Sequence, residues 1–378
     1  MRIALLTYST RPRGGVVATL ALAEALARAG ASVDLWTLAR GGDTGFFRPV
    51  DPAVGVHAVP FQDREGESLG PRVLRSIAAL REAFDRARAN QGYDIVHAQD
   101  CISANSAAPC LRTVHHLDNF TTPELATCHE KALREPLAHL CVSAAVAAEL
   151  RAGWGITATV IPNGVDADRF RAAAGPEEAA AGRRDAWRVC LGRYVLAVGG
   201  IEPRKGTLDL VEAFALLQRD WLPPAGAADP RPPRLVVAGG ETLFDYRDYR
   251  DAVDRRAAEL DVHIEVLGSI GHEDMPPLVA AAAAFAFPST REGFGLAAME
   301  ALAAGVPVVA SDLPVLREVF TGAVRFAAGP AALAAGLADA LRRDDPDLRT
   351  AGRALAARHS WDTAAAAHLA FYRSRLST

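Results

Sequence analysis

The sequence lacks a strong excess of charge of either sign. Its 41 lysine and arginine residues nearly balance its 45 aspartate and glutamate residues, and the formal net charge is −4. Proteins that bind nucleic acid through their overall electrostatic field carry a clear excess of basic residues. The charge balance therefore gives no reason to expect nucleic acid as a partner.

Long apolar runs are also missing. No uninterrupted apolar stretch of the sequence is long enough to span a membrane. The first residues, "MRIALLTYST", combine one arginine with a short apolar run and lack a small-residue cleavage site. We expect this stretch to be a buried first strand and not a signal peptide, and the protein to be cytoplasmic.

Cysteine is scarce, and its pattern does not indicate disulfides or zinc. The five residues are odd in number and form no C-x-x-C pair. Histidines lie near them along the chain, but their spacing matches no known zinc motif. We expect reduced, mostly buried thiols and no metal site.

The chain is too long for a single ordinary hydrophobic core. It has 378 residues, half of them apolar, and hydrophobic cores stop growing at about 250–300 residues. Apolar strand-like runs alternate with helical segments along the whole length, beginning with "RIALLTY", a glycine turn and "VVATLALAEALARAG". Nearly continuous apolar strands are typical of parallel sheets covered on both faces. The sequence predicts an α/β protein with two doubly wound, Rossmann-like domains.

Two series of strands indicate where the domains lie. The first series ends near Gly164 and the second begins with "YVLAVGG", while residues 171–192 show little strand character. We expect domains at 1–165 and 166–360, with the last helix (361–378) crossing back to the first. Ligands of open α/β sheets bind beyond the carboxyl ends of the strands. We therefore expect the domains to face each other across a cleft, with functional residues in the turns after strands.

One such turn, "REGFG", lies between an apolar strand and the helical run "GLAAMEALAAG". Amides at the start of that helix form an anion site, and glycines let a ligand approach the backbone. Carboxylates such as Glu292 and Glu300 accept hydrogen bonds from neighbouring hydroxyls, for example those of a ribose. The alternative is structural: Glu292 caps the helix and Glu300 is solvated. Because Glu300 lies among alanine, methionine and leucine, we favour a functional role.

The stretch "GGIEPRKGTLDL" follows the strand "YVLAV" and places Arg204 and Lys205 just before a helix. Cations at a helix N-terminus oppose the helix dipole. Such a local conflict is typical of functional sites, and two cations here would hold a diphosphate. The alternative is an exposed basic turn.

The first strand-to-helix turn contains Gly14 and Gly15. Glycine pairs at this position allow close approach of a phosphate or substrate, although a plain turn is an equal alternative. With Asp34 at the end of the second strand as a ribose ligand, the pair also suggests an NAD-type oxidoreductase. The G-x-G-x-x-G pattern of that class is absent.

Two adjacent histidines, His115 and His116, end the strand "RTVHHL". Neighbouring residues of a strand point to opposite faces, so one of them can reach a ligand while the other packs or is solvated. Histidine can bond to a sugar hydroxyl or exchange protons near neutral pH.

An amphipathic helix is predicted over residues 72–90. Val73, Ile77, Leu80 and Phe84 form one apolar face, and five arginines lie elsewhere on the helix. Such a helix could associate weakly with a membrane surface. Glu82 dilutes the positive charge, and the apolar stripe also fits an ordinary core, which we favour.

Several of these motifs together resemble retaining family 4 glycosyltransferases of the two-domain GT-B fold (glycosyltransferase group 1). The similarity rests on five stretches, which are in chain order "LCVSAAVAAEL", "VIPNGVDADRF", "GGIEPRKG", "REGFGLAAME" and "GVPVVASDLPVLREV". The fourth of them is an E-x7-E motif. It covers nearly the whole chain. It implies transfer of a sugar from a nucleoside-diphosphate sugar to an acceptor that the motifs do not identify: a sugar, a lipid or a small molecule.

The resemblance also implies roles for individual residues. In the second domain, which would bind the donor, Glu292 would contact the transferred sugar and Glu300 the ribose, while amides of Phe294, Gly295 and Leu296 would bind sugar and phosphate. Arg204 and Lys205 would hold the diphosphate. In the first domain, on the acceptor side, Gly14 and Gly15 would lie near the phosphates and acceptor, and His115 would bond to the donor sugar.

One departure concerns the strand-end glycine of the second domain. Many family members have a basic residue directly after it, where this chain reads "VGGIEPRKG". The diphosphate is then left to Arg204 and Lys205, with no metal or other cofactor expected. A catalytically silent scaffold of the same fold is the remaining alternative, and it would have lost charged site residues that this sequence keeps.

Overall fold

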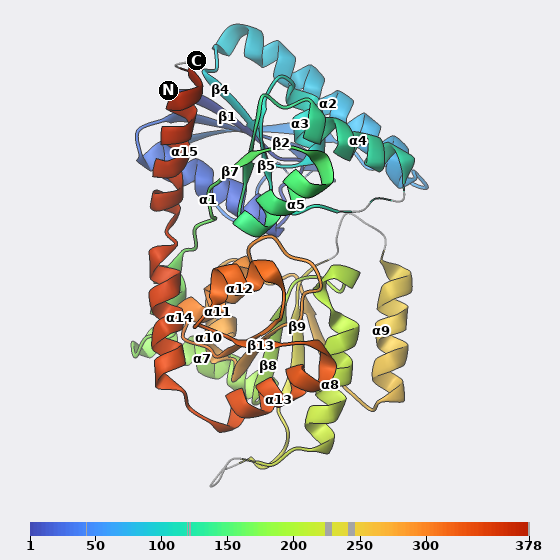
Figure 1. Ribbon diagram of the computed structural model, residues 1–378, viewed down its shortest axis with the longest axis vertical. Coiled ribbons are helices and arrows are strands. Elements are labelled where there is room, and N and C mark those ends of the chain that lie inside the picture. Colours follow the sequence, from blue (N-terminus) through green and yellow to red (C-terminus); the bar gives the residue numbers. More distant parts are fainter. Residues whose placement is uncertain (43, 119, 121, 224–228, 241–245, 377–378) are drawn as a thin grey trace. The chain divides into compact units, whose positions relative to one another are not determined.

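The computed structural model describes residues 1–378 except 43, 119, 121, 224–228, 241–245 and 377–378. The chain divides into two compact units (Figure 1). The first contains Met1–Gly164 and His359–Thr378, and the second contains Val165–Arg358. Each unit is a parallel sheet covered by helices, which confirms the predicted pair of doubly wound α/β domains.

The first unit contains a sheet of seven parallel strands in the order β3-β2-β1-β4-β5-β6-β7. Its strands are β1 (Arg2–Leu6), β2 (Ser32–Arg40), β3 (Val54–Phe61), β4 (Ile95–Ala98), β5 (Leu111–Val114), β6 (Ala138–Cys141) and β7 (Ala158–Val160). The strand order reverses between β1 and β4. The loops after these two strands therefore flank the point at which open α/β sheets bind ligands.

Six helices belong to this unit: α1 (Gly14–Arg28), α2 (Leu69–Gln91), α3 (Cys101–Ala107), α4 (Pro123–Arg134), α5 (Ala144–Trp154) and α15 (Trp361–Leu376). The C-terminal helix α15 lies against α1. Leu369 and Tyr372 of α15 are buried in one core cluster with Leu20, Leu26 and Leu35. Apolar burial thus attaches the last helix to the first sheet.

The edge strand β3 does not have the pattern from which the other strands are predicted. In its sequence, "VGVHAVPF", only the two end residues are fully buried. Continuous apolar runs are typical of strands covered on both faces. An edge strand that contains glycine, histidine and proline lacks such a run.

Helix α2 packs against the sheet through its apolar face. Val73, Leu80 and Phe84 are buried, and Leu80 and Phe84 share a core cluster with Trp36. The core interpretation of this helix is therefore correct for these side chains, which a membrane-surface helix would have to expose.

The second unit contains a sheet of six parallel strands in the order β10-β9-β8-β11-β12-β13. Its strands are β8 (Tyr194–Val198), β9 (Arg234–Ala238), β10 (Ile264–Gly268), β11 (Ala284–Phe287), β12 (Val308–Ser311) and β13 (Arg325–Ala327). The order reverses between β8 and β11, which pair directly.

The helices of the second unit are α6 (Ala167–Ala173), α7 (Glu178–Leu191), the 3-10 turn η1 (Pro203–Lys205), α8 (Thr207–Arg219), α9 (Arg247–Glu259), α10 (Met275–Ala281), α11 (Leu296–Ala303), α12 (Pro314–Phe320), α13 (Gly329–Arg342) and α14 (Pro346–Arg358). The stretch 171–192, which shows little strand character, is thus mostly helical and belongs to this unit. The chain passes from one unit to the other at Gly164 and Val165.

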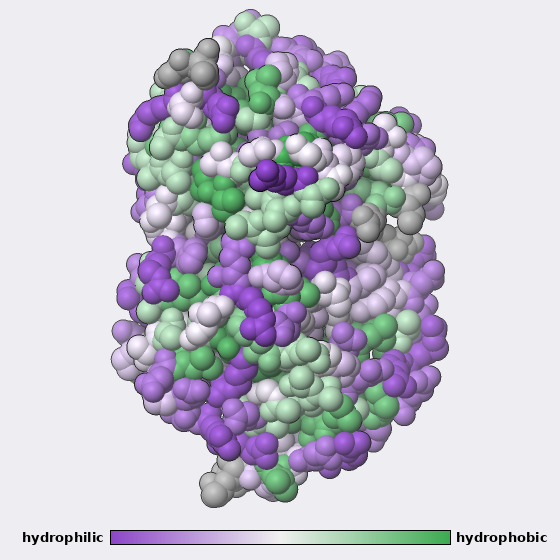
Figure 2. Space-filling view, in the orientation of Figure 1, coloured by the Kyte–Doolittle hydropathy of each residue, from purple (hydrophilic) through white to green (hydrophobic). Residues whose placement is uncertain are grey.

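The surface mixes polar and apolar residues. On the face shown in Figure 2, hydrophilic and hydrophobic side chains are interspersed over both units. Within the described ranges, the model has no helix with the length and apolar character that a membrane crossing requires. All five cysteines are free, and Cys110, Cys128 and Cys141 are buried.

Candidate active site

The first group of predicted residues lies beyond the carboxyl ends of β8 and β11. These strands are neighbours at the point where the strand order of the second sheet reverses. The loop after β8 carries Arg204 and Lys205 within η1, and the loop after β11 carries Glu292. Parallel strands direct both loops to the same edge, so residues that are distant in sequence meet there.

Lys205 and Glu292 form an ion pair across these two loops. Lys205 Nζ lies 2.9 Å from Glu292 Oε2, and Arg204 Nη1 lies 3.9 Å from the same oxygen. The side chains of Lys205 and Glu292 are 17% and 13% exposed. Glu292 also accepts hydrogen bonds from Ser289 Oγ and from the Gly293 amide, each at 3.4 Å. The carboxylate is therefore held in place before any ligand binds.

Glu202 is a charged residue of this site that the sequence analysis did not identify. It is buried, and its Oε1 accepts from Arg204 Nη2 at 2.6 Å. The pair fixes the guanidinium beside Lys205, because buried carboxylates require a partner. The sequence "IEPRKG" contains a signal for this residue, because an acidic side chain there lies close enough to pair with one of the two cations that follow it.

Two glycines allow these loops to approach each other. Gly206 has φ of +65°, and a Cβ there would lie 2.0 Å from the carbonyl oxygen of Pro288. Gly295 has φ of +98°, and a Cβ there would lie 2.8 Å from the Phe320 ring. Both positions exclude other residues by steric overlap as well as by conformation.

Helix α11 starts at Leu296, with Gly295 as its N-cap. Phe294 is buried just before it. The amides at the start of this helix are therefore placed as predicted, because the first amides of a helix have no intrahelical acceptor. Gly305, with φ of +74°, follows the helix end as expected for a C′ residue.

Glu300 lies within the second turn of α11 and is half-buried. Burial raises the pKa of its carboxyl from 4.5 to about 7, although the nearby Arg169 guanidinium acts in the opposite direction. Burial destabilises the charged form of a carboxyl group. Glu300 is therefore not the solvated surface residue of the structural alternative.

A second group of predicted residues lies in the first unit. Gly14 and Gly15 are the first two residues of α1, after the loop that follows β1. Neither has a positive φ, and a Cβ on Gly14 would meet no atom within 4 Å. A Cβ on Gly15 would come no closer than 3.8 Å to the ring of His115. The fold of this unit does not itself require glycine at either position.

His115 and His116 lie just beyond the end of β5, which stops at Val114, and not within the strand as predicted. Their surroundings nevertheless differ. Nε2 of His115 is 3.2 Å from Oε1 of Gln99, which follows β4. His116 instead pairs with Asp118 at 2.9 Å. Burial lowers the pKa of His115 to about 3, with His116, Arg112 and His368 adding to the effect. His115 is therefore a neutral imidazole next to Gly15.

The prediction that Asp34 ends the second strand is wrong. Asp34 is the third residue of β2, near the amino end of that strand. Its oxygens contact His57 Nε2 at 3.1 Å and the Tyr93 hydroxyl at 2.9 Å. A ribose ligand of a dinucleotide site belongs at the carboxyl end. The strand boundary was misjudged because "SVDLWTLAR" continues for six residues beyond Asp34.

No cluster of three or more histidine, cysteine, aspartate or glutamate side chains suited to a metal ion occurs in the part of the chain that the structure describes. The charged groups that do converge there are the two ion pairs of the second unit, Lys205–Glu292 and Arg204–Glu202. A site that combines lysine and arginine side chains with helix amides can bind a phosphate group directly.

Two family models match the chain and together cover most of it. Residues 12–169 match Glycosyltransferase Family 4, and residues 192–355 match Glycosyl transferases group 1. The D-inositol 3-phosphate glycosyltransferase of Pseudarthrobacter chlorophenolicus is 30% identical over 98% of this chain and 94% of its own length.

Solved structures of similar fold are more distant in sequence. Sucrose-phosphate synthase from Thermosynechococcus elongatus has a TM-score of 0.76 at 21% identity and covers 100% of this chain and 99% of its own. Anabaena HepE in complex with UDP-glucose has a TM-score of 0.68 at 20% identity and covers 98% and 99%. No oxidoreductase relationship supports the alternative based on Gly14, Gly15 and Asp34. The chain belongs to glycosyltransferase family 4 (group 1), and it is a retaining glycosyltransferase with the GT-B fold.

Proposed function

We propose that the enzyme takes its sugar from a nucleoside-diphosphate sugar and needs no resident metal. The observation that carries the proposal is the convergence of Arg204, Lys205 and Glu292 at the switch point of the second sheet. Two cations and a carboxylate at this edge match a diphosphate and the sugar attached to it.

Donor binding would exchange one partner of Lys205 for another. Without donor, Glu292 neutralises Lys205 at 2.9 Å. A diphosphate carries more negative charge than a carboxylate and would compete for the ammonium group, with Arg204 beside it. Glu292 would then be released to accept hydrogen bonds from hydroxyls of the transferred sugar.

Helix α11 would bind the remaining parts of the donor. The amides of Phe294, Gly295 and Leu296 would donate to sugar and phosphate oxygens. Glu300 would accept hydrogen bonds from the ribose hydroxyls, for which its carboxylate must be ionised. Because its pKa is raised to about 7, the fraction of Glu300 that is ionised changes close to neutral pH.

In the first unit, Gly14 and Gly15 would leave room for the phosphates and acceptor, and His115 would bond to the donor sugar. The absence of any steric need for glycine at these two positions supports a ligand role. Glycine in a helix is less stable than alanine by up to about 1 kcal/mol, so keeping it without a structural need indicates a functional constraint.

Cleavage of the donor leaves negative charge on the nucleoside diphosphate. Arg204, Lys205 and the α11 amides would stabilise that charge by preorganised electrostatics. With retention of configuration, the acceptor would attack on the face that the diphosphate leaves, and the leaving phosphate would take the acceptor proton. This route requires no protein base.

HepE has been solved in complex with UDP-glucose, so UDP-sugars are the first donors to test. We propose a sugar, lipid or small molecule as acceptor. We also propose a cytoplasmic location, which the five free thiols support.

The test is a turnover screen of UDP-, GDP- and ADP-sugars, measured as release of nucleoside diphosphate with and without candidate acceptors. We expect one donor class to be consumed and its turnover to persist in excess EDTA. Loss of turnover in EDTA that Mg²⁺ or Mn²⁺ restores would contradict metal independence. No release from any donor would contradict the proposed donor chemistry.

A further inference from the structure

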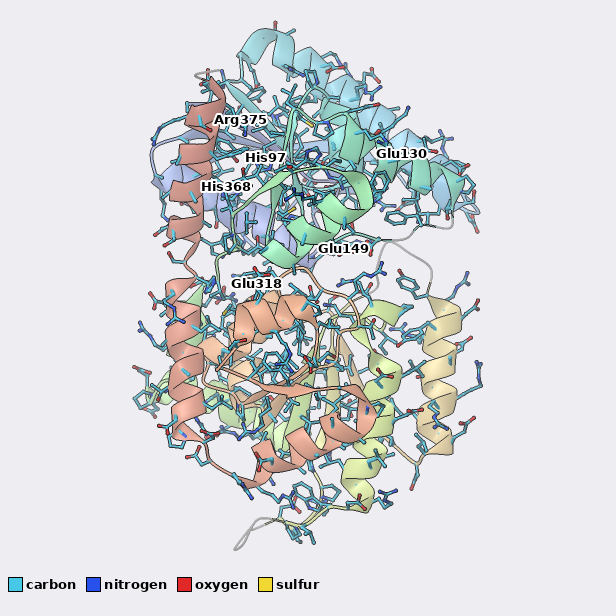
Figure 3. The ribbon with its side chains drawn as sticks, in the orientation of Figure 1. His97, Glu130, Glu149, Glu318, His368 and Arg375 are labelled. Carbon is cyan, nitrogen blue, oxygen red and sulfur yellow. The ribbon has the colours of Figure 1, made fainter. Side chains whose placement is uncertain are left out.

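A chain of buried hydrogen bonds connects the C-terminal helix to His115. The Tyr372 hydroxyl of α15 is 2.7 Å from Nδ1 of His97, a partner 275 positions away in sequence. Nε2 of His97 is 2.8 Å from Thr113 Oγ1 and 3.3 Å from Nε2 of Gln99. Gln99 Oε1 then lies 3.2 Å from Nε2 of His115. Figure 3 shows His97 beside His368, where α15 covers the sheet.

Solvent does not reach the middle of this series of hydrogen bonds. His97 and Tyr372 are 0% exposed and Gln99 is 4% exposed. Burial also holds the pKa of His97 well below its ordinary value, so its imidazole is neutral. A buried neutral imidazole has one donor nitrogen and one acceptor nitrogen, and its neighbours decide which is which.

The orientation of the Gln99 amide gives the chain a direction. An amide nitrogen only donates and an amide oxygen only accepts. Nε2 of His97 must therefore accept from Gln99 and Thr113, and Nδ1 of His97 must donate to the Tyr372 hydroxyl. At the other end, Gln99 Oε1 must accept a proton that is carried by Nε2 of His115.

We propose that Gln99 is a positioning residue that holds His115 protonated on Nε2, so that Nδ1 of His115 accepts a hydrogen bond from a hydroxyl of the donor sugar. In this arrangement the Tyr372 hydroxyl accepts the hydrogen bond from Nδ1 of His97. The proposal rests on the proposed function for the role of His115. Nδ1 of His115 has no hydrogen-bond partner among the residues that the structure describes.

The opposite arrangement would give His115 the opposite role. If the Tyr372 hydroxyl donated to His97 and the Gln99 amide were reversed, Gln99 would donate to His115 Nε2. His115 would then carry its proton on Nδ1 and would donate to the sugar. The Tyr372 hydroxyl can donate or accept, so the orientation of the Gln99 amide distinguishes the two arrangements and decides whether His115 offers an acceptor or a donor.

Nitrogen-15 NMR of histidine-labelled protein tests the tautomer directly, with the His115 signals assigned by their loss in His115→Ala. We expect a protonated Nε2 and an unprotonated Nδ1 at pH 7. A protonated Nδ1 overturns the proposal. The measurement needs no activity, so it decides the tautomer even if the donor screen finds no transfer and the proposed function fails.

Substitutions of Gln99 test the consequence for turnover. Gln99→Leu removes the hydrogen bonds to His97 and to His115. Only the bond to His115 acts on the group that we propose to contact the sugar, so kcat/KM for the donor should fall about two- to tenfold, with affinity for the free nucleoside diphosphate unchanged. Gln62→Leu makes the same change at an exposed position of the same unit and should leave both values as they are. A Gln99→Leu enzyme that is folded and fully active contradicts the proposal.

Gln99→Glu keeps an oxygen that can accept from His115, removes the amide group that donates to His97, and adds a negative charge. The carboxylate should raise the pKa of His115, against the combined effect of burial and of the facing groups His116, Arg112 and His368. Imidazolium has no free lone pair on Nδ1, so turnover should fall at a higher pH on the acid side than in the wild type. An unshifted acid limb in a folded Gln99→Glu enzyme contradicts the role of Gln99.

Tyr372→Phe removes only the hydroxyl at the start of the chain. We expect the His115 tautomer to become mixed in the NMR spectrum and kcat/KM to fall, by less than in Gln99→Leu. Tyr194→Phe is the matched control, because the Tyr194 hydroxyl is also buried and donates to the carbonyl of Leu278 in the other unit. An unchanged His115 spectrum in Tyr372→Phe removes the helix α15 from the proposal.

Discussion

The two units carry different chemistry on similar sheets. At the carboxyl edge of β8 and β11, the second unit presents two ion pairs, Lys205–Glu292 and Arg204–Glu202. Beyond the carboxyl ends of β4 and β5, the first unit instead brings two neutral groups together, with Gln99 bonded to His115. Burial lowers the pKa of His115 to about 3, so its imidazole is neutral near pH 7.

This difference matches the charge of the ligand groups that we propose for each unit, a diphosphate for the second and sugar hydroxyls for the first. A diphosphate gains negative charge as the donor is cleaved, and preorganised cations and helix amides would stabilise it. Sugar hydroxyls are neutral, and directed hydrogen bonds from neutral groups select them without a large desolvation penalty. Substitutions should therefore affect the two units differently, which the following predictions test.

The largest effect is expected for Lys205→Met. Loss of this cation should lower turnover roughly a hundred- to a thousandfold, because charge on the leaving group is no longer stabilised. It should also lower stability by about 1–3 kcal/mol, because Glu292 loses its partner in a largely buried position. Steady-state kinetics and thermal unfolding measure the two effects.

Lys131→Met is the control for this substitution, since Lys131 is exposed on α4. The double variant Lys205→Met/Glu292→Gln removes both charges and should regain stability but not turnover. A double variant that is no more stable than Lys205→Met would show that the ion pair is not what Lys205 contributes to folding.

The two glutamates should separate binding from turnover. Glu300→Gln should weaken the free nucleoside diphosphate about ten- to a hundredfold, through loss of a charge-assisted hydrogen bond to ribose. Glu292→Gln should cut turnover and leave that affinity unchanged or higher, because Lys205 is released from its ion pair. Calorimetry with the nucleoside diphosphate decides, with Glu178→Gln on the exposed face of α7 as control. Loss of binding only in Glu292→Gln would reverse the two assignments.

His115→Ala should lower turnover about tenfold, whereas His116→Ala should have little effect. His115 lies beside Gly15 and bonds to Gln99, while His116 is directed to Asp118. Kinetics on both variants, with circular dichroism to verify folding, tests the assignment. A larger effect of His116→Ala would move the sugar contact to the other face of the strand end.

The affinity for nucleoside diphosphate should depend on pH through Glu300. Its pKa is about 7 in the folded protein and 4.5 ordinarily. Ribose hydroxyls require the carboxylate, so affinity should fall by about tenfold between pH 8 and pH 6 as Glu300 becomes protonated. Calorimetry between pH 6 and 8 measures this change. In Glu300→Gln, the part of the pH dependence that comes from Glu300 should be missing. If the wild type and Glu300→Gln show the same pH dependence, it arises from titration of the phosphate groups and not from Glu300.

The smallest effect is expected for the stability of Gly15→Ala. A Cβ there would make only ordinary contact with His115, so stability should be unchanged or higher by about 0.5 kcal/mol. Turnover should nevertheless fall, because the methyl group would occupy space proposed for the ligand. Thermal unfolding and kinetics on one variant show whether the glycine serves the fold or the ligand. Unchanged turnover in Gly15→Ala would show that the ligand does not occupy the space next to Gly15.

Much of the fold could be predicted from local pattern. Apolar runs of buried strands and helical periodicity predict two doubly wound domains, because a strand covered on both faces must be apolar throughout. The edge strand β3 escaped prediction because one of its faces is open to solvent. Asp34 was misplaced for a related reason, since local pattern does not mark where along its length a strand lies relative to the ligand edge.

Charged and glycine residues in turns after strands can be identified from the sequence alone. The type of residue and its position next to a helix start carry the chemistry, so the order of residues along the chain is enough to single out Arg204, Lys205 and Glu292. Their pairing does not follow from that order, because Lys205 and Glu292 are 87 positions apart and meet through the arrangement of strands.

The tertiary structure alone decided which groups touch. Glu202 is a site residue because it is buried against Arg204, and the sequence offers no measure of burial for one acid in a polar loop. The hydrogen bonds from Tyr372 to His115 join residues on or just after α15, β4 and β5, which sheet order and the return of α15 bring together. Residue type determines what a side chain can donate or accept, and only packing determines what it meets.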